Sequence, residues 1–202
     1  MQVATREFMA ALRHRCSEVG ALLIFDEIQT GFGRTGKMFA FEHYNVVPDI
    51  LTMAKALGGG MPLGAFAASK ELMNAWQSNP PLGHITTFGG HPVSCAAALA
   101  SLKILLRERW IEEVGEKNRM YVEALSAHPR VKEIRSLGLL IAVDLKDESA
   151  AHDILYRLLE EGVLTDWFLF QPTSFRIAPP LCISFDEVKL SIDLIIKALD
   201  KL

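Results

Sequence analysis

Short apolar runs alternate with polar and glycine-rich turns in the first third of the chain. The run at residues 22–25 leads directly into Asp26, and the run at residues 50–53 ends just before Lys55. Short apolar runs bounded by turn signals are typical of buried parallel strands. In open α/β sheets, ligands bind outside the carboxyl ends of such strands. We therefore expect Asp26 and Lys55 to bring a carboxylate and an amine to one cleft.

The remaining pattern predicts helices and strands in alternation. Apolar residues at three- and four-residue spacing predict a helix over residues 6–19, ended by Gly20. Further helices are predicted at 70–77, 93–106, 110–127, 150–161 and 187–199. Further strands are predicted at 63–68, 131–134, 139–145, 163–165 and 175–177. The units become shorter near residue 107, so we predict two parts: 1–106, and a small α/β domain at 107–202.

Composition excludes several classes of function. The 202 residues are 50% hydrophobic and 22% charged, which is enough to bury a core, and the net charge is −3. We expect no nucleic-acid partner, because no basic block occurs, and no membrane span, because no apolar run approaches ~20 residues. The three cysteines are odd in number and widely spaced. They predict reduced, buried thiols in a cytoplasmic protein and neither a disulfide framework nor a metal site.

An aspartate and a lysine at neighbouring strand ends fit one cofactor chemistry. Pyridoxal phosphate needs a lysine for its Schiff base and an acid to hold its pyridinium nitrogen. The acid keeps the ring protonated, and a protonated ring is the better electron sink. Each residue also has an ordinary alternative: Asp26 as a loop or helix-capping acid, and Lys55 as a solvated surface charge.

The sequence around these two residues resembles a known family. The stretch LLIFDEIQTGFGRTG resembles the signature of the class III, fold-type I pyridoxal-phosphate aminotransferases, the ornithine/acetylornithine/4-aminobutyrate group. Four further stretches match in the family's order: residues 48–50 (PDI), 55–60 (KALGGG), 86–92 (TTFGGHP) and 176–181 (RIAPPL). The resemblance covers nearly the whole chain, but only the C-terminal half of such a protein.

This resemblance implies a fold, an activity and a set of site residues. The fold would be α/β: part of a fold-type I large domain, with a mostly parallel sheet and helices, followed by a small C-terminal α/β domain. The activity would be transfer of an amino group from an amino acid to a 2-oxo acid. Lys55 would form the Schiff base, Asp26 would bind the pyridinium nitrogen, and Gln29 would lie near the cofactor's 3′-oxygen. Thr87 would bind the phosphate of the neighbouring subunit in a homodimer, and Arg176 would bind the substrate carboxylate.

Other interpretations of individual residues stay open at this point. Glu27 either supports the site or is solvated, and the loop glycines suit positive φ or a phosphate-lining turn. Thr87 is alternatively a helix N-cap, and Arg176 a surface charge. Three aromatic residues before Arg176 either line a pocket or belong to the core: Trp167, Phe168 and Phe170.

Rival functions also stay open. A decarboxylase or an aminomutase of the same fold uses the same lysine and aspartate. The main phosphate-binding loop of the family would lie in the missing N-terminal half. The chain is therefore expected to pair with that half as part of a split enzyme, or to be a catalytically silent fragment.

Overall fold

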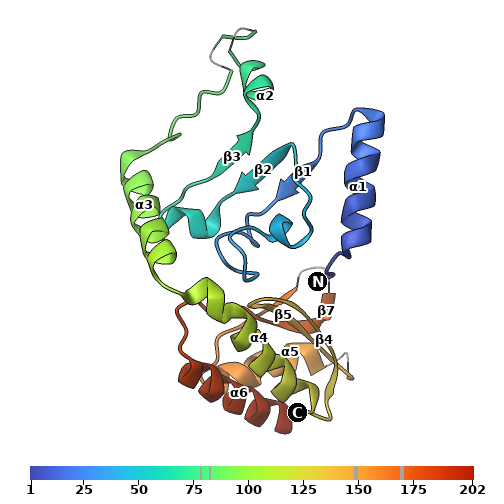
Figure 1. Cartoon of the computed structure of the whole chain (residues 1–202). Helices are drawn as coiled ribbons and strands as arrows, with labels where there is room; N and C mark the ends of the chain where they lie inside the picture. Colours follow the sequence, from blue (N-terminus) through green and yellow to red (C-terminus); the bar gives the residue numbers. More distant parts are fainter. Residues whose placement is uncertain (78, 82, 148–149, 169–170) are drawn as a thin grey trace. The chain divides into compact units, whose positions relative to one another are not determined.

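The computed structural model describes residues 1–77, 79–81, 83–147, 150–168 and 171–202. The chain forms two compact units (Figure 1). The N-terminal unit comprises Ala4–Gly33 and Lys37–Arg109. The C-terminal unit comprises Trp110–Leu202 and two short upstream segments, Met1–Val3 and Arg34–Gly36. The sequence pattern did not predict that these two segments belong to the C-terminal unit. The predicted domains, 1–106 and 107–202, stay a prediction.

The first helix is confirmed at both ends. Helix α1 runs over Arg6–Val19. The hydroxyl of Thr5 accepts the amide of Phe8 at 3.2 Å, which satisfies one of the free N–H groups at the helix start. Gly20 ends the helix with φ 68°, a left-handed conformation that glycine adopts without steric cost.

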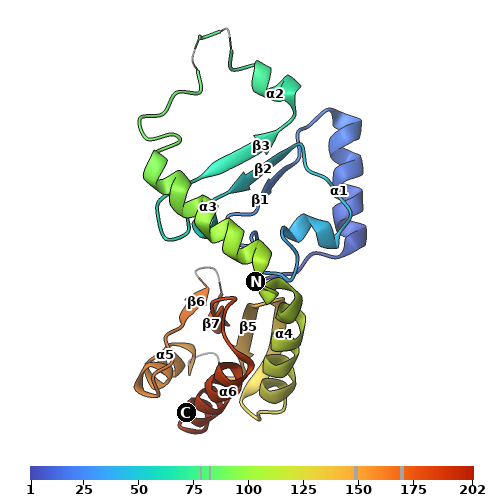
Figure 2. The same cartoon turned by 60° about the vertical axis from the view of Figure 1, so that its left-hand side comes forward.

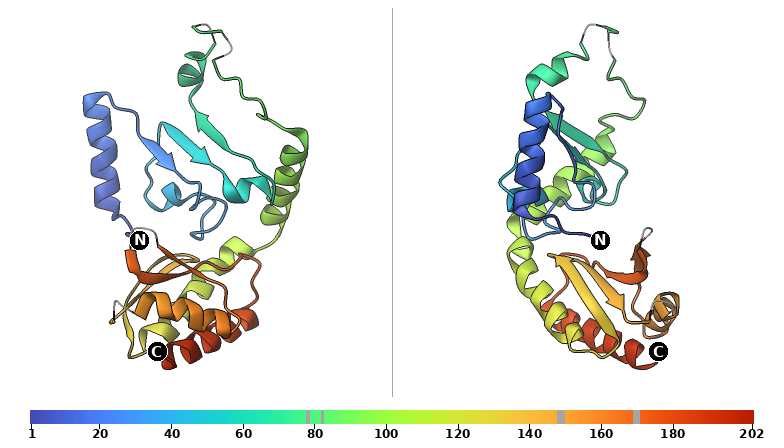
Figure 3. Two further views of the ribbon diagram at one scale, coloured as in Figure 1. Left: turned by 180° about the vertical axis from the view of Figure 1, so that it is seen from behind. Right: turned by 90° about the vertical axis from the view of Figure 1, so that its right-hand side faces the viewer.

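The N-terminal unit contains a three-stranded sheet in the order β1-β2-β3. The strands are β1 (Ile24–Asp26), β2 (Ile50–Met53) and β3 (Ala65–Ala68). β1 and β2 are parallel, whereas β3 runs antiparallel to β2. Figure 3 shows α1 and the longer helix α3 (Pro92–Arg107) on either side of these strands. The expectation of a parallel pair is therefore right for β1 and β2, and the third strand pairs antiparallel with β2.

The expectation of buried strands is also wrong for much of this sheet. Ile24 of β1 is 55% exposed and Phe66 of β3 is 47% exposed. Helix α3, expected to be closely packed, buries only Ser94 and Ala98. An apolar pattern shows the capacity for burial, but the described chain does not supply enough structure to cover these faces.

Short helical turns connect the strands. A 3-10 helix, η1 (Ala40–His43), precedes β2, and a second, η2 (Lys55–Gly58), follows it. Helix α2 (Lys70–Asn74) is shorter than predicted. η2 packs against α3, and Gly59 makes this contact possible, because a Cβ there would lie 2.6 Å from the carbonyl oxygen of Ala97.

The C-terminal unit is an antiparallel sheet covered by three helices. The strand order is β4-β5-β7-β6, with bounds Val131–Leu137 (β4), Leu140–Leu145 (β5), Asp166–Phe168 (β6) and Gln171–Ile177 (β7). The helices are α4 (Trp110–Ser126), α5 (Ala150–Glu160) and α6 (Phe185–Asp200). Figure 2 shows the three helices across one face of the sheet, where they enclose a core that includes Leu125, Phe175 and Ile195. Strand β6 begins after the predicted range 163–165.

The three cysteines are free thiols. Cys16 is half-buried, whereas Cys95 and Cys182 are exposed, so the expectation that all three are buried is wrong. Cys95 lies on α3, whose apolar sides are exposed in the described chain.

Candidate active site

The parallel pair β1 and β2 brings two candidate residues to neighbouring strand ends. In the β1–β2 register, Asp26 is opposite Thr52, one residue before β2 ends. Lys55 follows shortly after, as the first residue of η2. The expectation that these two strands are neighbours in one sheet is confirmed. Both side chains are exposed in the described chain.

Lys55 has an unusual backbone conformation. Its φ is 47°, a left-handed value that costs a residue with a side chain about 1 kcal/mol or more. Residues in such conformations gather at functional sites, where the surrounding structure holds them in place. Here the packing of η2 against α3 supplies that support. The arrangement fixes the direction in which the Lys55 side chain leaves the strand end.

Asp26 has one oxygen engaged and a side chain open to an incoming donor. Its Oδ1 accepts the amide of Ile28 at 3.0 Å. The side chain also lines a small cavity of about 220 Å³ together with residues of α1 and η1. Gln29 lies in the turn that follows Asp26 and is exposed. Asp26, Gln29 and Lys55 therefore belong to the same end of the β1–β2 pair.

Glu27 is buried, so the solvated alternative is wrong. The side chain is 2% exposed, and its Oε2 and Oε1 accept the amides of Ala40 at 2.9 Å and Phe41 at 2.7 Å. The hydroxyl of Thr30 donates to the same carboxylate. Together with burial, this charge raises the pKa of the Tyr44 phenol, with burial the larger cause. Glu27 ties the glycine-rich turn after β1 to η1.

Glu27→Gln is expected to lower the free energy of unfolding by about 2 kcal/mol, because an amide cannot accept on both sides. One of the backbone amides of η1 would then face the NH₂ group. Thermal unfolding at one fixed protein concentration measures the effect, with Glu71→Gln on the exposed surface of α2 as the control. Equal midpoints for the two variants would show that the Glu27 carboxylate does not stabilise the turn.

The glycine-rich stretch serves packing in the described chain. A Cβ on Gly31 would lie 2.9 Å from the carbonyl oxygen of Glu27 and close to the Phe39 ring. Thr35 is buried, with 3% of its surface exposed. A Cβ on Gly138 would lie 2.5 Å from the backbone of Thr35, so this part of the stretch packs into the C-terminal unit. The interpretation of this stretch as a phosphate-lining turn stays a prediction.

Thr87 lies in an exposed turn that precedes α3. The N-cap of α3 is His91, so the alternative of Thr87 as N-cap is wrong. The His91 side chain makes no capping hydrogen bond. Amide groups in the first turn of such a helix attract anions.

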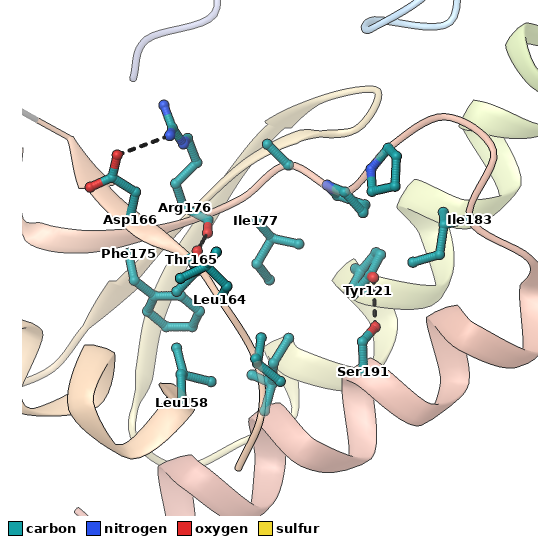
Figure 4. Close-up of a pocket in the computed structure, with 15 residues that line it drawn as sticks. Tyr121, Leu158, Leu164, Thr165, Asp166, Phe175, Arg176, Ile177, Ile183 and Ser191 are labelled. Atoms are coloured by element: carbon teal, nitrogen blue, oxygen red, sulfur yellow. Dashed lines mark hydrogen bonds and ion pairs between the residues drawn. The ribbon is translucent and has the colours of Figure 1, made fainter. Parts of the chain in front are cut away.

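Arg176 lies on β7 of the C-terminal unit and lines a cavity of about 510 Å³. Its guanidinium is 3.1 Å from the carboxylate of Asp166 on β6. Figure 4 shows this group pointing toward Asp166, while the hydroxyls of Tyr121 and Ser191 meet at another part of the cavity. Arg176 is therefore half-buried and paired, and not a free surface charge.

Trp167 and Phe168 do not line this cavity. Trp167 is 43% exposed and lies 5.9 Å from the ring of His152, measured between ring centroids. Phe168 is half-buried in β6. Phe170 lies outside the described residues.

The polar groups of the N-terminal unit fit pyridoxal phosphate. Asp26 offers a carboxylate for a ring N–H, Lys55 a primary amine, and Gln29 an amide on the same end of the strands. The start of α3, with Thr87 just before it, offers N–H groups and a hydroxyl that suit a phosphate. Within the described ranges, no group of three or more His, Cys, Asp or Glu residues could hold a metal ion. The helices described there also include none that is long and apolar enough to cross a membrane.

The family comparison decides what this arrangement belongs to. The sequence model of the class III aminotransferase family matches residues 1–199. The chain belongs to the class III aminotransferases. Solved structures similar to this class III chain include an aminotransferase from Bacillus anthracis, with 33% identity and a TM-score of 0.90 over 99% of this chain and 49% of that chain.

Two ornithine aminotransferases are also similar. The Plasmodium falciparum enzyme is 30% identical, with a TM-score of 0.88 over 98% of this chain and 51% of its own. The Toxoplasma gondii enzyme is 33% identical, with a TM-score of 0.86 over 96% of this chain and 46% of its own. The predicted fold class is confirmed by these likenesses, and this class III aminotransferase chain spans about half the length of the structures that it matches.

Sequence reasoning missed two functional candidates. Arg34 was seen only as part of a glycine-rich motif, yet its guanidinium makes long-range contacts in the C-terminal unit. Lys117 was seen only as a charge on an amphipathic helix, yet it is 1% exposed. Its ammonium pairs with Glu113 at 2.8 Å and donates to the carbonyl of Leu181 at 3.2 Å. No local pattern predicts the contacts of Arg34 with Leu139 and Pro179 or of Lys117 with Leu181, because these contacts join segments far apart in sequence.

Proposed function

We propose that the protein works in pyridoxal-phosphate-dependent transamination, in which an amino group passes from an amino acid to a 2-oxo acid. The observation that carries this proposal is the parallel pairing of β1 and β2, which brings Asp26 and Lys55 to neighbouring strand ends. The similar ornithine aminotransferase from Toxoplasma gondii holds pyridoxal phosphate at its active site with partial occupancy. The same cofactor fits the side-chain groups of Asp26, Gln29 and Lys55 at the ends of β1 and β2.

Each candidate residue has a role that follows from its chemistry. The bound cofactor supplies an electron sink for the bond that breaks at the substrate's α-carbon. Lys55 would hold the cofactor through its amine, and the same amine would carry the proton to and from that carbon. Asp26 would hold the proton on the ring nitrogen, and Gln29 would lie near the cofactor's 3′-oxygen. Thr87 binds phosphate in the neighbouring subunit, and Arg176 orients the substrate carboxylate in a fork of hydrogen bonds.

The partners that we propose are the amino acid and 2-oxo acid substrates, a second copy of the chain, and the N-terminal half of the class III fold. Exposed apolar side chains support the two protein partners, because large exposed apolar patches mark interaction surfaces. Three free cysteines favour a reducing compartment, and we propose the cytoplasm.

The isolated chain is expected to associate and to bind cofactor weakly. The edge strand β3 carries an uncharged, exposed sequence, Ala65–Ala68, without the features that protect strand edges from pairing. Phosphate contacts also supply much of the grip on such a cofactor. Light scattering, visible absorption with added pyridoxal phosphate, and an amino-transfer assay on the 202-residue chain test this expectation. A soluble monomer that shows a stable cofactor band and multiple turnovers would refute it.

The proposed reaction itself is tested by adding the two substrates in turn. In a complex that supplies the N-terminal half of the fold, an amino acid alone should change the cofactor's visible spectrum. A 2-oxo acid added afterwards should restore it, because the amino group leaves the protein only in the second half-reaction. Release of CO₂ in place of 2-oxo acid formation would identify a decarboxylase and contradict the proposal.

A further inference from the structure

Arg34 joins two distant parts of the C-terminal unit through a single nitrogen. Its Nη1 donates to the carbonyl of Leu139 at 3.0 Å and to the carbonyl of Pro179 at 2.6 Å. The backbone of Arg34 is held at the same place, because its carbonyl accepts the amide of Leu139 at 2.9 Å. Leu139 lies in the turn between β4 and β5, and Pro179 lies just after β7. Arg34 therefore connects the β4–β5 turn to the chain that leaves β7.

The local packing leaves Arg34 little freedom. The Thr35 backbone fits against Gly138, where any larger residue would clash. The side-chain amide of Asn118 donates to the carbonyl of Gly138 at 2.8 Å and holds the turn from α4. The segment Arg34–Gly36 is thus built into the C-terminal unit by its backbone, and the Arg34 side chain starts from a fixed point.

The charges of Arg34 and Arg176 are close enough to interact. Burial, and to a lesser degree the positive charge of Arg176, lower the pKa of the Arg34 guanidinium below its usual value. The acceptors of Arg34 in the described chain are neutral carbonyls, whereas Arg176 pairs with Asp166. Two cations and one carboxylate leave an excess of positive charge here, which favours an incoming anion.

A comparison with Lys117 shows why Arg34 is the stronger candidate. Lys117 also holds the segment after β7, through the carbonyl of Leu181. However, Lys117 is paired with Glu113, so it adds no net charge with that partner. Arg34, in contrast, contacts the carbonyl of Pro179, three positions after Arg176. In the described chain its charge meets neutral carbonyls and no carboxylate.

We propose that Arg34 is a positioning residue for Arg176. By holding the Pro179 and Leu139 carbonyls, Arg34 fixes the chain that leaves β7 and so sets where the Arg176 guanidinium meets a substrate carboxylate. Its charge also strengthens that binding. This inference rests on the proposed role of Arg176 in binding the substrate carboxylate.

The test uses phenylglyoxal, which modifies arginine side chains, and peptide mass spectrometry of the 202-residue chain. Glutarate, a dicarboxylate without an amino group, should protect Arg176 from modification. Arg34→Met should raise the glutarate concentration needed for half-protection about tenfold, in line with the strength of charge-assisted hydrogen bonds. Arg34→Lys should recover part of the affinity, because it restores the charge with a shorter side chain. Arg119→Met, which removes an exposed charge on α4, is the control and should leave protection unchanged.

The outcomes separate this inference from the proposed function. If Arg176 in the Arg34→Met variant is half-protected at the same glutarate concentration as in the wild-type chain, the positioning role is overturned. If glutarate fails to protect Arg176 even in the wild-type chain, the carboxylate role of Arg176 fails. The positioning claim is then decided by the rate at which phenylglyoxal modifies Arg176 without glutarate. Arg34→Met should change this rate about threefold or more, because the chain that leaves β7 loses its anchor. An unchanged rate would overturn it. Circular dichroism checks folding, and Arg34→Lys carries the test if Arg34→Met does not fold.

Discussion

Lys55→Arg is expected to lower the rate of amino transfer by about 10⁴-fold or more, in a complex that supplies the N-terminal half of the class III fold. Arginine keeps the positive charge but does not become the neutral amine that holds the cofactor and moves the proton. The fold should be unchanged, because both side chains face the same cost at φ 47°. Steady-state rates and thermal midpoints of the two complexes measure the effect.

Lys70→Arg is the matched control for this prediction. Lys70 is an exposed lysine at the start of α2, in the same unit as Lys55. Its replacement should leave the rate within about twofold of wild type, as for most surface changes. A Lys55→Arg complex that retains a tenth of the wild-type rate would show that another amine performs this role.

Asp26→Asn is expected to lower the same rate by about 10²- to 10³-fold, because a preorganised charge is a large catalytic term. The asparagine carbonyl can still accept the amide of Ile28, which the Asp26 Oδ1 accepts at 3.0 Å. The fold should therefore persist, while the charge that holds a proton on the cofactor ring is lost. Spectra with added cofactor and rates at saturating substrate separate weakened binding from slowed chemistry.

Asp193→Asn, on the exposed surface of α6, controls for the loss of one negative charge. It should leave both the spectrum and the rate unchanged. If Asp26→Asn keeps a rate close to that of this control, a different group must hold the ring nitrogen.

Local patterns predicted those elements that local forces determine. Helix α1 follows from its three- and four-residue spacing and from Gly20, whose positive φ ends it. The β1–β2 pair follows from two short apolar runs, and it was enough to bring Asp26 and Lys55 to one edge. Strand β6 was misplaced because a short apolar run gives no alternation from which to locate a strand.

Long-range contacts explain what the sequence did not predict. Arg34 and Leu139 are separated by 105 positions, and no periodicity links them. Glu27 was left open because burial of a carboxylate depends on the amides that surround it, which belong to η1. The apolar pattern of β1, β3 and α3 predicts faces that can be covered, but it does not tell which chain provides the covering surface.

Borohydride reduction followed by peptide mass spectrometry tests the central claim most directly. The claim is that the ends of β1 and β2 form the cofactor site of a class III aminotransferase. The complex that supplies the N-terminal half of the fold would be loaded with pyridoxal phosphate, reduced, digested and sequenced by mass spectrometry. We expect the phosphopyridoxyl group on the peptide that contains Lys55, and its loss in Lys55→Arg. A label on another lysine, or none despite bound cofactor, would contradict the account.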